Sequence, residues 1–146
     1  MPTIEETHSK VQRLLLAKFG RVELDKNNNF IVRHESAVVF VRVSEGFDDD
    51  GTMVQFDCPL VTGVEITNEL CFWIATEGSK YLLGSISLIP DSDGGHGLVT
   101  FEYSIVSDDL DESELIHGLS AVVHVGNKVD NEVQNMFGGE LFGSEP

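Results

Sequence analysis

Apolar residues recur every three or four positions in two segments of the chain, which is the spacing of amphipathic helices. The first segment covers residues 4–19, where Thr3 and Glu6 have capping-box spacing and Gly20 can end the helix. The second begins at the cap residue Asp111 and ends at Phe137. Its apolar stripe consists of Leu115, Leu119, Val122, Gly126, Val129, Val133 and Met136. Gly126 interrupts this stripe, which predicts either a kink or a close backbone approach.

Between these helices the hydrophobic period shortens to two, which is typical of strands. Residues 22–32 read as a hairpin whose turn is the asparagine-rich stretch 26–29. Residues 37–43 are apolar on both faces, which favours a central strand. A fourth strand covers residues 53–60, and Pro59 predicts that the edge or the end of the sheet lies there. Residues 81–89 and 98–106 form a further strand pair joined by a glycine-rich loop.

A short helix between these strand groups starts at Thr67 or Asn68 and ends at Gly78. The resulting order is helix, four strands, short helix, two strands and long helix, which favours an α+β fold with an antiparallel meander sheet covered by helices. The length of 146 residues suits one domain. We expect this domain to span residues 1–142 and the remaining residues, 143–146, to form a loose tail.

The charge of −16 is distributed unevenly along the chain. Residues 1–43 carry seven basic and five acidic side chains, whereas residues 44–146 carry two basic and twenty acidic ones. An acidic surface repels a phosphate backbone, so nucleic acid is not expected as a partner. The acidic excess either keeps the protein soluble or steers a basic protein or peptide toward it.

No stretch of the sequence has the length and apolarity of a membrane span, and the first residues lack the charged flank and apolar core of a signal peptide. We therefore expect a cytoplasmic protein without a membrane partner. Cys58 and Cys71 both lie among apolar neighbours, so reduced thiols in the core are expected, with a disulfide as the alternative.

Residues that could carry chemistry are scattered. His117 and His124 share a helical face. They are two helical turns apart, a rise of about 10.5 Å in total, which is too far for both to bind one metal ion. The glycine-rich stretch 94–97 lacks the following helix that a phosphate cradle needs, and the acidic stretch 48–51 lacks the ligands of a calcium loop. No catalytic motif is present, which predicts a protein without enzymatic activity, cofactor or metal.

The large consecutive side chains Phe72, Trp73 and Ile74 are the candidate partner-binding residues. One turn of helix cannot direct all three inward, so we expect one of them to lie at the surface. Tryptophan and phenylalanine are enriched where proteins contact each other, which favours a peptide or subunit interface. The alternative is that a bend or a nearby loop covers the exposed side chain.

With the elements placed, the chain resembles the type III secretion chaperone-like family, which includes the YbjN-like and TY-Chap groups. Four stretches carry the resemblance: the 36–43 strand, the 68–78 helix, the 97–103 strand and the terminal helix from Leu110 to Phe137. The resemblance implies a strongly bent antiparallel sheet, frequent dimerisation and a role in holding a partner chain in an extended form. The shared motifs are structural, so no functional residue is transferred.

The leading hypothesis is a non-enzymatic, chaperone-like protein that binds a protein or an extended peptide through an apolar groove with acidic surroundings. A homodimer is one arrangement that would cover exposed apolar residues. The alternative is a regulatory or assembly module that binds a folded protein. A third class, a small hydrolase or ligand-binding enzyme, predicts a deep pocket where histidines and carboxylates converge.

Overall fold

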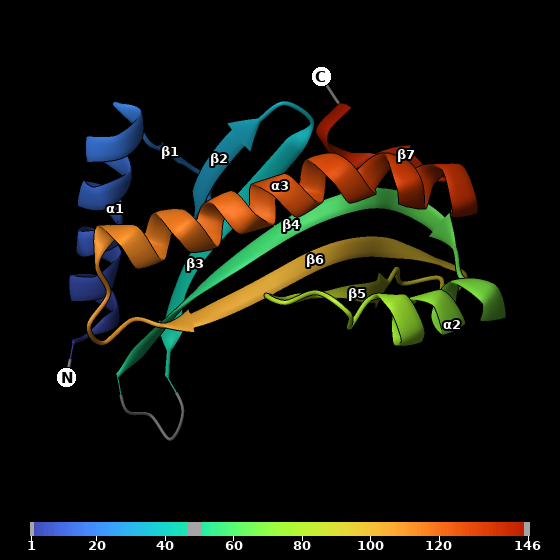
Figure 1. The fold of residues 1–146 in the computed structure, drawn as a ribbon, viewed down its shortest axis with the longest axis horizontal. Helices are drawn as coiled ribbons and strands as arrows, with labels where there is room; N and C mark the ends of the chain where they lie inside the picture. The colour runs from blue at the N-terminus through green and yellow to red at the C-terminus, as the bar shows by residue number, and fades with distance from the viewer. Residues whose placement is uncertain (1, 47–50, 145–146) are drawn as a thin grey trace.

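The computed structural model describes residues 2–46 and 51–144. These residues form three α-helices, seven strands and a 3₁₀ helix (Figure 1). In chain order the elements are α1 (Ile4–Phe19), β1 (Glu23–Leu24), β2 (Phe30–His34), β3 (Ala37–Glu45), β4 (Thr52–Glu65), α2 (Asn68–Glu77), β5 (Ser85–Pro90), β6 (His96–Val106), α3 (Glu112–Phe137), β7 (Glu140–Leu141) and η2 (Phe142–Ser144).

All seven strands belong to one antiparallel sheet with the order β1-β2-β3-β4-β6-β5, and β7 pairs with β4 outside this path. The α+β class is therefore confirmed. The first four strands follow one another as the meander predicts, but β6 lies between β4 and β5. In Figure 1, α3 runs along one face of the sheet, α1 lies across one end of the molecule, and α2 lies at the other end.

The helix ends agree with the capping residues that the sequence contains. Thr3 and Glu6 form a capping box in which each side chain accepts from the backbone of the other, and Asp111 accepts from the amide of Glu114 at 2.8 Å. Side-chain capping of this kind satisfies amide groups that have no partner within the helix. It explains why both long helices begin where the sequence predicts.

The close approach at Gly126 is confirmed as the reason for a glycine in the stripe of α3. A β-carbon placed on Gly126 would lie 2.6 Å from Sγ of Cys58 and 3.2 Å from Cβ of Ala37. One member of the predicted stripe differs, because the side chain of Met136 is 50% exposed. In the last turn Phe137 packs inward instead, with its ring 5.6 Å from that of Trp73 in α2.

Strand β4 is longer than predicted and continues past Pro59 to Glu65, so the sheet does not end at Pro59. The predicted edge is present on one side, where no β3 partner follows Asp57 among the described residues. Pairing between β3 and β4 ends at Phe40 and Asp57, and the pairing of β4 with β6 is irregular between Pro59 and Val64. The missing amide of Pro59 is tolerated where one ladder has ended and the other is bulged. Bulges also bend a strand, and β4 and β6 curve strongly in Figure 1.

The segment before β5 and the end of the chain also differ from the sequence prediction. Residues 81–84 are not a strand: Gly84 has a φ of +83°, and the ring of Tyr81 packs against Phe101 at 5.3 Å. A loose tail is predicted from Gly143, whereas Gly143 belongs to η2 and contacts the carbonyl of Ser36. The predicted tail residues 145–146 lie outside the described part of the chain.

The hydrophobic core lies between the sheet and the two long helices. Its largest fully buried side chains include Phe30, Phe56, Phe101, Leu15, Leu60 and Leu115. Buried hydroxyl groups connect α1 to the sheet, since Thr52 Oγ1 lies 2.7 Å from Thr7 Oγ1 and 2.8 Å from Ser107 Oγ. Each buried hydroxyl therefore has a partner, which avoids the cost of an unpaired polar group.

Candidate functional site

The three candidate partner-binding residues lie on α2, where they have different environments. The hydroxyl of Thr67 caps the helix by accepting from the amide of Leu70, which is fully buried. Trp73 and Ile74 are half-buried and pack against the core. The side chain of Phe72 is 71% exposed. The structure therefore agrees with the expectation that one of the three lies at the surface.

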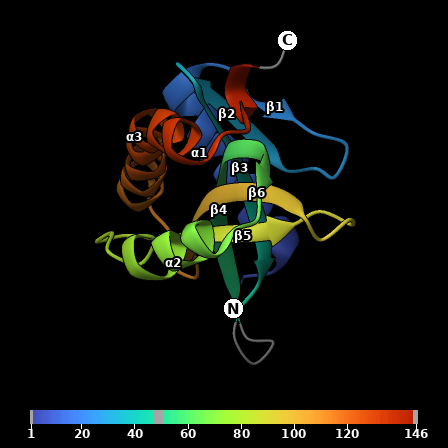
Figure 2. The same ribbon diagram turned by 90° about the vertical axis from the view of Figure 1, so that its right-hand side faces the viewer.

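Other exposed apolar side chains follow directly after α2. Leu82 is 98% exposed and Leu83 is 40% exposed, in the segment between α2 and β5. The segment runs from the end of α2 toward the middle of the molecule before β5 begins (Figure 1 and Figure 2). The sequence analysis missed these two leucines because it assigned them to a strand. We call Phe72, Leu82 and Leu83, together with the acidic residues Glu69 and Glu77, the α2 surface.

The α2 surface has an acidic border. Glu69 and Glu77 are both exposed, and Glu77 forms an ion pair with Lys80 at 3.1 Å. Burial, followed by the charges of Glu132 and Glu77, raises the pKa of Tyr81 above its ordinary value. The negative charges of α2 and α3 are therefore close enough to act on the same phenol.

The two cysteines have different environments. Cys58 is buried as predicted, and burial together with the charge of Asp130 raises the pKa of its thiol to about 12. Such a thiol is a poor nucleophile because the thiolate is the reactive form. The prediction that Cys71 is also buried is wrong. Leu70, Trp73 and Ile74 take the inner face of α2 at helical spacing, so Cys71 is directed outward beside Phe72.

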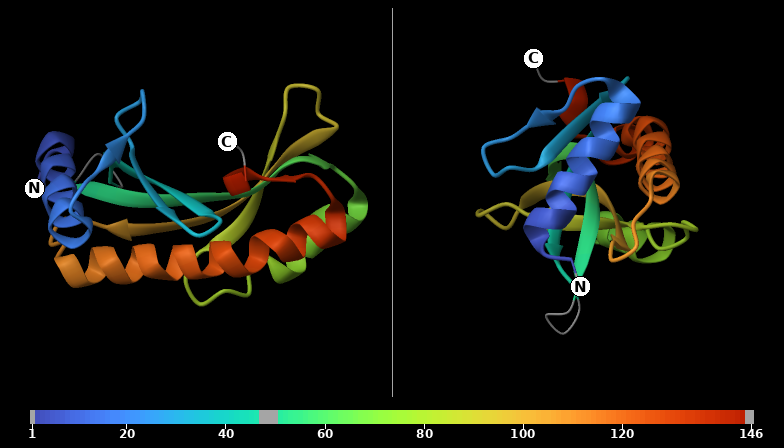
Figure 3. Two further views of the ribbon diagram at one scale, coloured as in Figure 1. Left: turned by 90° about the horizontal axis from the view of Figure 1, so that it is seen from above. Right: turned by 90° about the vertical axis from the view of Figure 1, so that its left-hand side faces the viewer.

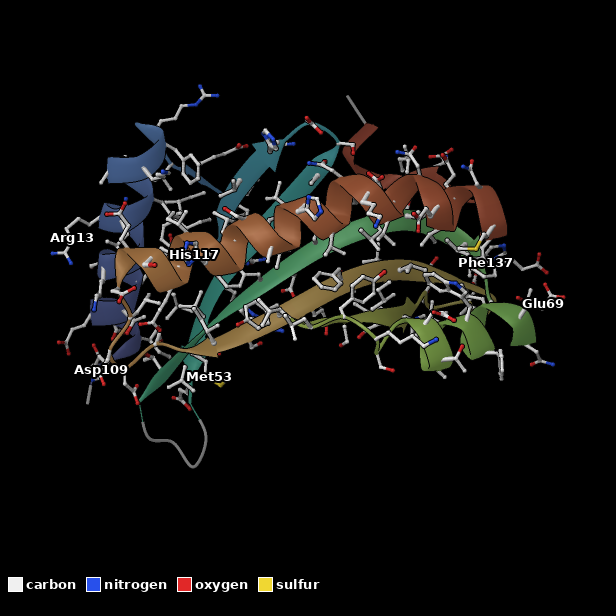
Figure 4. The ribbon with its side chains drawn as sticks, viewed as in Figure 1. Arg13, Met53, Glu69, Asp109, His117 and Phe137 are labelled. Carbon is white, nitrogen blue, oxygen red and sulfur yellow. The ribbon has the colours of Figure 1, made fainter. Side chains whose placement is uncertain are left out.

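A cleft lies between α1 and the middle of the molecule, although the sequence hypothesis associates an apolar groove with the Phe72 cluster. It has a volume of about 610 Å³ and lies between the end of α1, strands β1 and β2, and the middle of α3. Figure 4 shows Arg13 of α1 and Glu69 of α2 at opposite ends of the molecule. The cleft is lined by Leu15, Phe19, Arg21, Val22, Glu23, Ile31, Val32, Arg33, His34, Glu35, Ser120, Val123, His124 and Asn127.

The sheet face away from α3 carries two neighbouring carboxylates. Asp57 of β4 and Glu102 of β6 are paired across the strands, and this face lies between two projecting hairpins in Figure 3. Burial raises the pKa of Asp57, while Arg42 and Gln55 act in the opposite direction. Burial and the charge of Asp57 raise the pKa of Glu102. The guanidinium of Arg42 donates to Gln55 on this face.

The candidate metal and phosphate residues do not form a site. His117 and His124 are exposed on α3, and His117 approaches only Ser113, with 3.4 Å between Nδ1 and Oγ. In the glycine-rich loop, Asp93 accepts from the amides of Gly95 and His96, as a hairpin turn requires. Within residues 2–46 and 51–144 no group of three or more histidine, cysteine or acidic side chains could hold a metal ion. Residues 48–50 of the candidate calcium loop lie outside the described residues.

Two polar residues of α3 with a structural role were missed in the sequence. Asn127 Oδ1 accepts from the amide of Ala37 at 2.8 Å, and Asp130 accepts from the hydroxyl of Ser36 at 2.6 Å. Asp130 is 3% exposed. These bonds hold the turn between β2 and β3, which borders the cleft, against α3. The signal in the sequence is the position of both residues beside the apolar stripe, one turn apart.

The structure is an α+β fold in which a long helix lies on a bent antiparallel sheet and a short helix exposes one aromatic side chain. The chain belongs to the TY-Chap1 family, described as "T3SS (YopN, CesT) and YbjN peptide-binding chaperone 1", whose model matches residues 5–145. The resemblance inferred from the sequence is thereby confirmed.

Among solved structures, the chain is similar to YbjN of E. coli, for which a role in transcription regulation has been suggested. The two share 12% sequence identity, the TM-score is 0.65, and the match covers 97% of this chain and 96% of YbjN. At this identity the likeness shows the fold alone. No curated protein sequence matches the chain. None of the helices in the described residues is long and apolar enough to cross a membrane.

Proposed function

We propose that this protein is a non-enzymatic, cytoplasmic chaperone-like protein that holds an extended segment of a basic protein or peptide on its α2 surface. The observation that carries the proposal is the 71% exposure of Phe72, an aromatic side chain on a surface bordered by acidic residues. Aromatic residues are enriched where proteins contact each other, and contiguous exposed apolar patches mark interaction sites. Membership of a family described as peptide-binding chaperones supports the same class of function.

The three candidate residues have separate roles in this proposal. Phe72 is the anchor that an apolar side chain of the partner covers. Trp73 and Ile74 hold α2 on the body of the protein, since Trp73 packs against Phe137 and Ile74 against the core. Leu82 and Leu83 extend the apolar contact beyond the end of α2. The expected partner segment therefore alternates apolar and basic residues.

The charge of the molecule favours a basic partner over nucleic acid. Residues 44–146, which include α2 and its acidic border, carry a large excess of acidic side chains. Complementary charge speeds association and selects the partner, while phosphate would be repelled. Suggested regulation of transcription by YbjN therefore does not lead us to propose DNA binding for this chain.

The first experiment measures binding of synthetic peptides by the fluorescence of Trp73. Trp73 is the single tryptophan of the chain, and it follows Phe72 directly. We expect extended peptides with alternating apolar and basic residues to change its emission and acidic peptides of the same apolar content to have no effect. Phe72→Ala should weaken binding by about tenfold or more, as truncation of an interface anchor does.

The matched control is Val106→Ala, which shortens another exposed apolar side chain, at the end of β6. This variant should bind the basic peptides as the wild type does. Equal affinity of wild type and Phe72→Ala would contradict the proposal. Binding that requires a native partner and is lost with its denatured form would instead favour the alternative, a regulatory or assembly module for a folded protein.

A further inference from the structure

The cleft between α1, the β1–β2 hairpin and α3 is separate from the α2 surface and has a different chemistry. Its wall is apolar where Leu15 and Phe19 of α1 face Val22, Val32 and Val123. Its volume of about 610 Å³ lies in the range of sites that enclose small molecules. A site for an extended peptide would need a longer continuous groove. The size of the cleft therefore favours a small ligand.

Several polar groups of the cleft can donate hydrogen bonds to a ligand. Within the described residues, the side chains of Arg21, His34 and His124 take part in no hydrogen bond or ion pair. Arg33 is paired with Glu23, with 3.2 Å between Nε and Oε2, so these two charges offset each other. The amide oxygen of Asn127 is occupied by Ala37, which leaves its NH₂ group as a donor. Glu35 is the one carboxylate of the cleft that is not in an ion pair within the described residues.

The charge of the cleft differs from that of the molecule as a whole. The charged side chains of its lining balance, with Arg21 and Arg33 against Glu23 and Glu35, so the cleft has no acidic excess. The rest of the molecule is strongly acidic. An anion therefore meets a more favourable environment here than on the acidic remainder of the chain, and an apolar wall lies beside it.

We propose that this cleft binds a small amphipathic carboxylate, with its apolar body against Val22, Val32 and Val123 and its carboxylate near Arg21 and His124. The site is independent of the proposed peptide-binding function and differs from it in position and in charge preference. A guanidinium and an imidazole that have no protein partner can donate to the carboxylate without breaking existing bonds. Donors of this kind form stronger hydrogen bonds with an anion than with a neutral group.

The test is a titration of the full-length protein with octanoate, followed by calorimetry and by NMR of the valine methyl groups. Octylamine and octanol serve as probes of equal chain length with a positive charge and with no charge. We expect octanoate to bind with the highest affinity and to shift the methyl signals of Val22, Val32 and Val123. The emission of Trp73 should stay unchanged, because Trp73 lies with α2 at the opposite end of the molecule.

Arg21→Gln is expected to weaken octanoate binding by about tenfold, the loss that follows removal of a charged hydrogen-bond donor. Arg13→Gln is the matched control, because it removes the same charge from α1 outside the cleft. Circular dichroism verifies that both variants are folded. The proposal is overturned by equal affinity for octanoate and octylamine, by absence of octanoate binding, or by equal effects of the two substitutions. Binding of an acidic peptide in place of octanoate would overturn it as well.

Discussion

At the scale of single residues, Gly126 is the position where α3 comes close to the sheet. A methyl group there would lie 2.6 Å from Sγ of Cys58. Overpacking costs about 1–3 kcal/mol, whereas replacing a helical glycine by alanine gains about 1 kcal/mol. We expect Gly126→Ala to lower the free energy of unfolding, measured by urea denaturation, because the clash outweighs the gain in helix propensity.

A second substitution separates the clash from other effects of the methyl group. Cys58→Ala removes the sulfur that the new methyl would meet, so Gly126→Ala should be less destabilising in that background than in the wild type. Ser120→Ala, at an exposed position of the same helix, controls for changes in propensity. An equal cost of Gly126→Ala in both backgrounds would show that Cys58 does not select the glycine.

The same residues show how far a single sequence predicts side-chain environments. Periodicity identifies the face of α3 that turns inward. It does not decide whether Gly126 marks a kink or a close approach, because the close approach depends on the position of Cys58 in β4. On α2 the sequence indicates that one large side chain is exposed and cannot say that it is Phe72. The outward direction of Cys71 follows from which three residues of that short helix face the core.

At the scale of elements, the pairing of β4 with β6 places two carboxylates next to each other. Folding raises the pKa of Glu102 through burial and the charge of Asp57, so the folded protein holds a proton there more tightly than the unfolded chain. Above the raised pKa the carboxyl of Glu102 is ionised in both states, and its ionised form is then less stable in the folded protein than in the unfolded chain. Glu102→Gln should therefore raise the free energy of unfolding at neutral pH by about 0.2–1 kcal/mol, the size of cross-strand pair effects.

The gain in unfolding free energy from Glu102→Gln should depend on pH. The gain from Glu102→Gln should disappear as the pH falls through the raised pKa of Glu102, because the wild-type carboxyl then becomes neutral in the folded state. Glu45→Gln removes one charge at an exposed position at the end of β3 and serves as the control. Urea denaturation at several pH values measures the difference. A gain that is independent of pH, or no gain at neutral pH, would contradict the proposed repulsion.

Helices were more predictable than strands in this chain, for physical reasons. A helix end is decided locally, by capping side chains such as Thr3 and Asp111. The ends of a strand depend on its neighbours: β4 continues past Pro59 because the adjoining ladders stop or bulge there. The position of β6 between β4 and β5 is a property of the whole sheet. The cleft depends on how α1, β2 and α3 pack together. Neither can be predicted from the hydrophobic pattern of one segment.

At the scale of the whole molecule, charge divides the protein into two unlike parts. Residues 1–43, which include α1, β1 and β2, hold seven of the nine basic side chains and much of the cleft lining, whereas α2 belongs to the acidic remainder of the chain. Such a division lets one small fold present two surfaces with opposite preferences, an apolar carboxylate at one end and a basic segment at the other. The acidic side chains of residues 44–146 also repel one another, and this repulsion is stronger in the compact folded state, so it lowers the free energy of unfolding.

Salt should therefore stabilise the fold. Raising the ionic strength from about 0.01 M to about 1 M shortens the screening length from about 30 Å to about 3 Å. The repulsion among the acidic residues acts over longer distances than the close ion pairs do. Salt therefore weakens the repulsion more than it weakens the ion pairs. The two ion pairs between basic side chains and carboxylates in the described residues, Arg33–Glu23 and Lys80–Glu77, are exposed and contribute little. We expect the melting temperature in sodium chloride to rise by at least about 2 °C, which corresponds to roughly 1 kcal/mol for a domain of this size. A melting temperature that falls with salt would mean that attraction between the basic side chains of residues 1–43 and the acidic remainder of the chain dominates over self-repulsion.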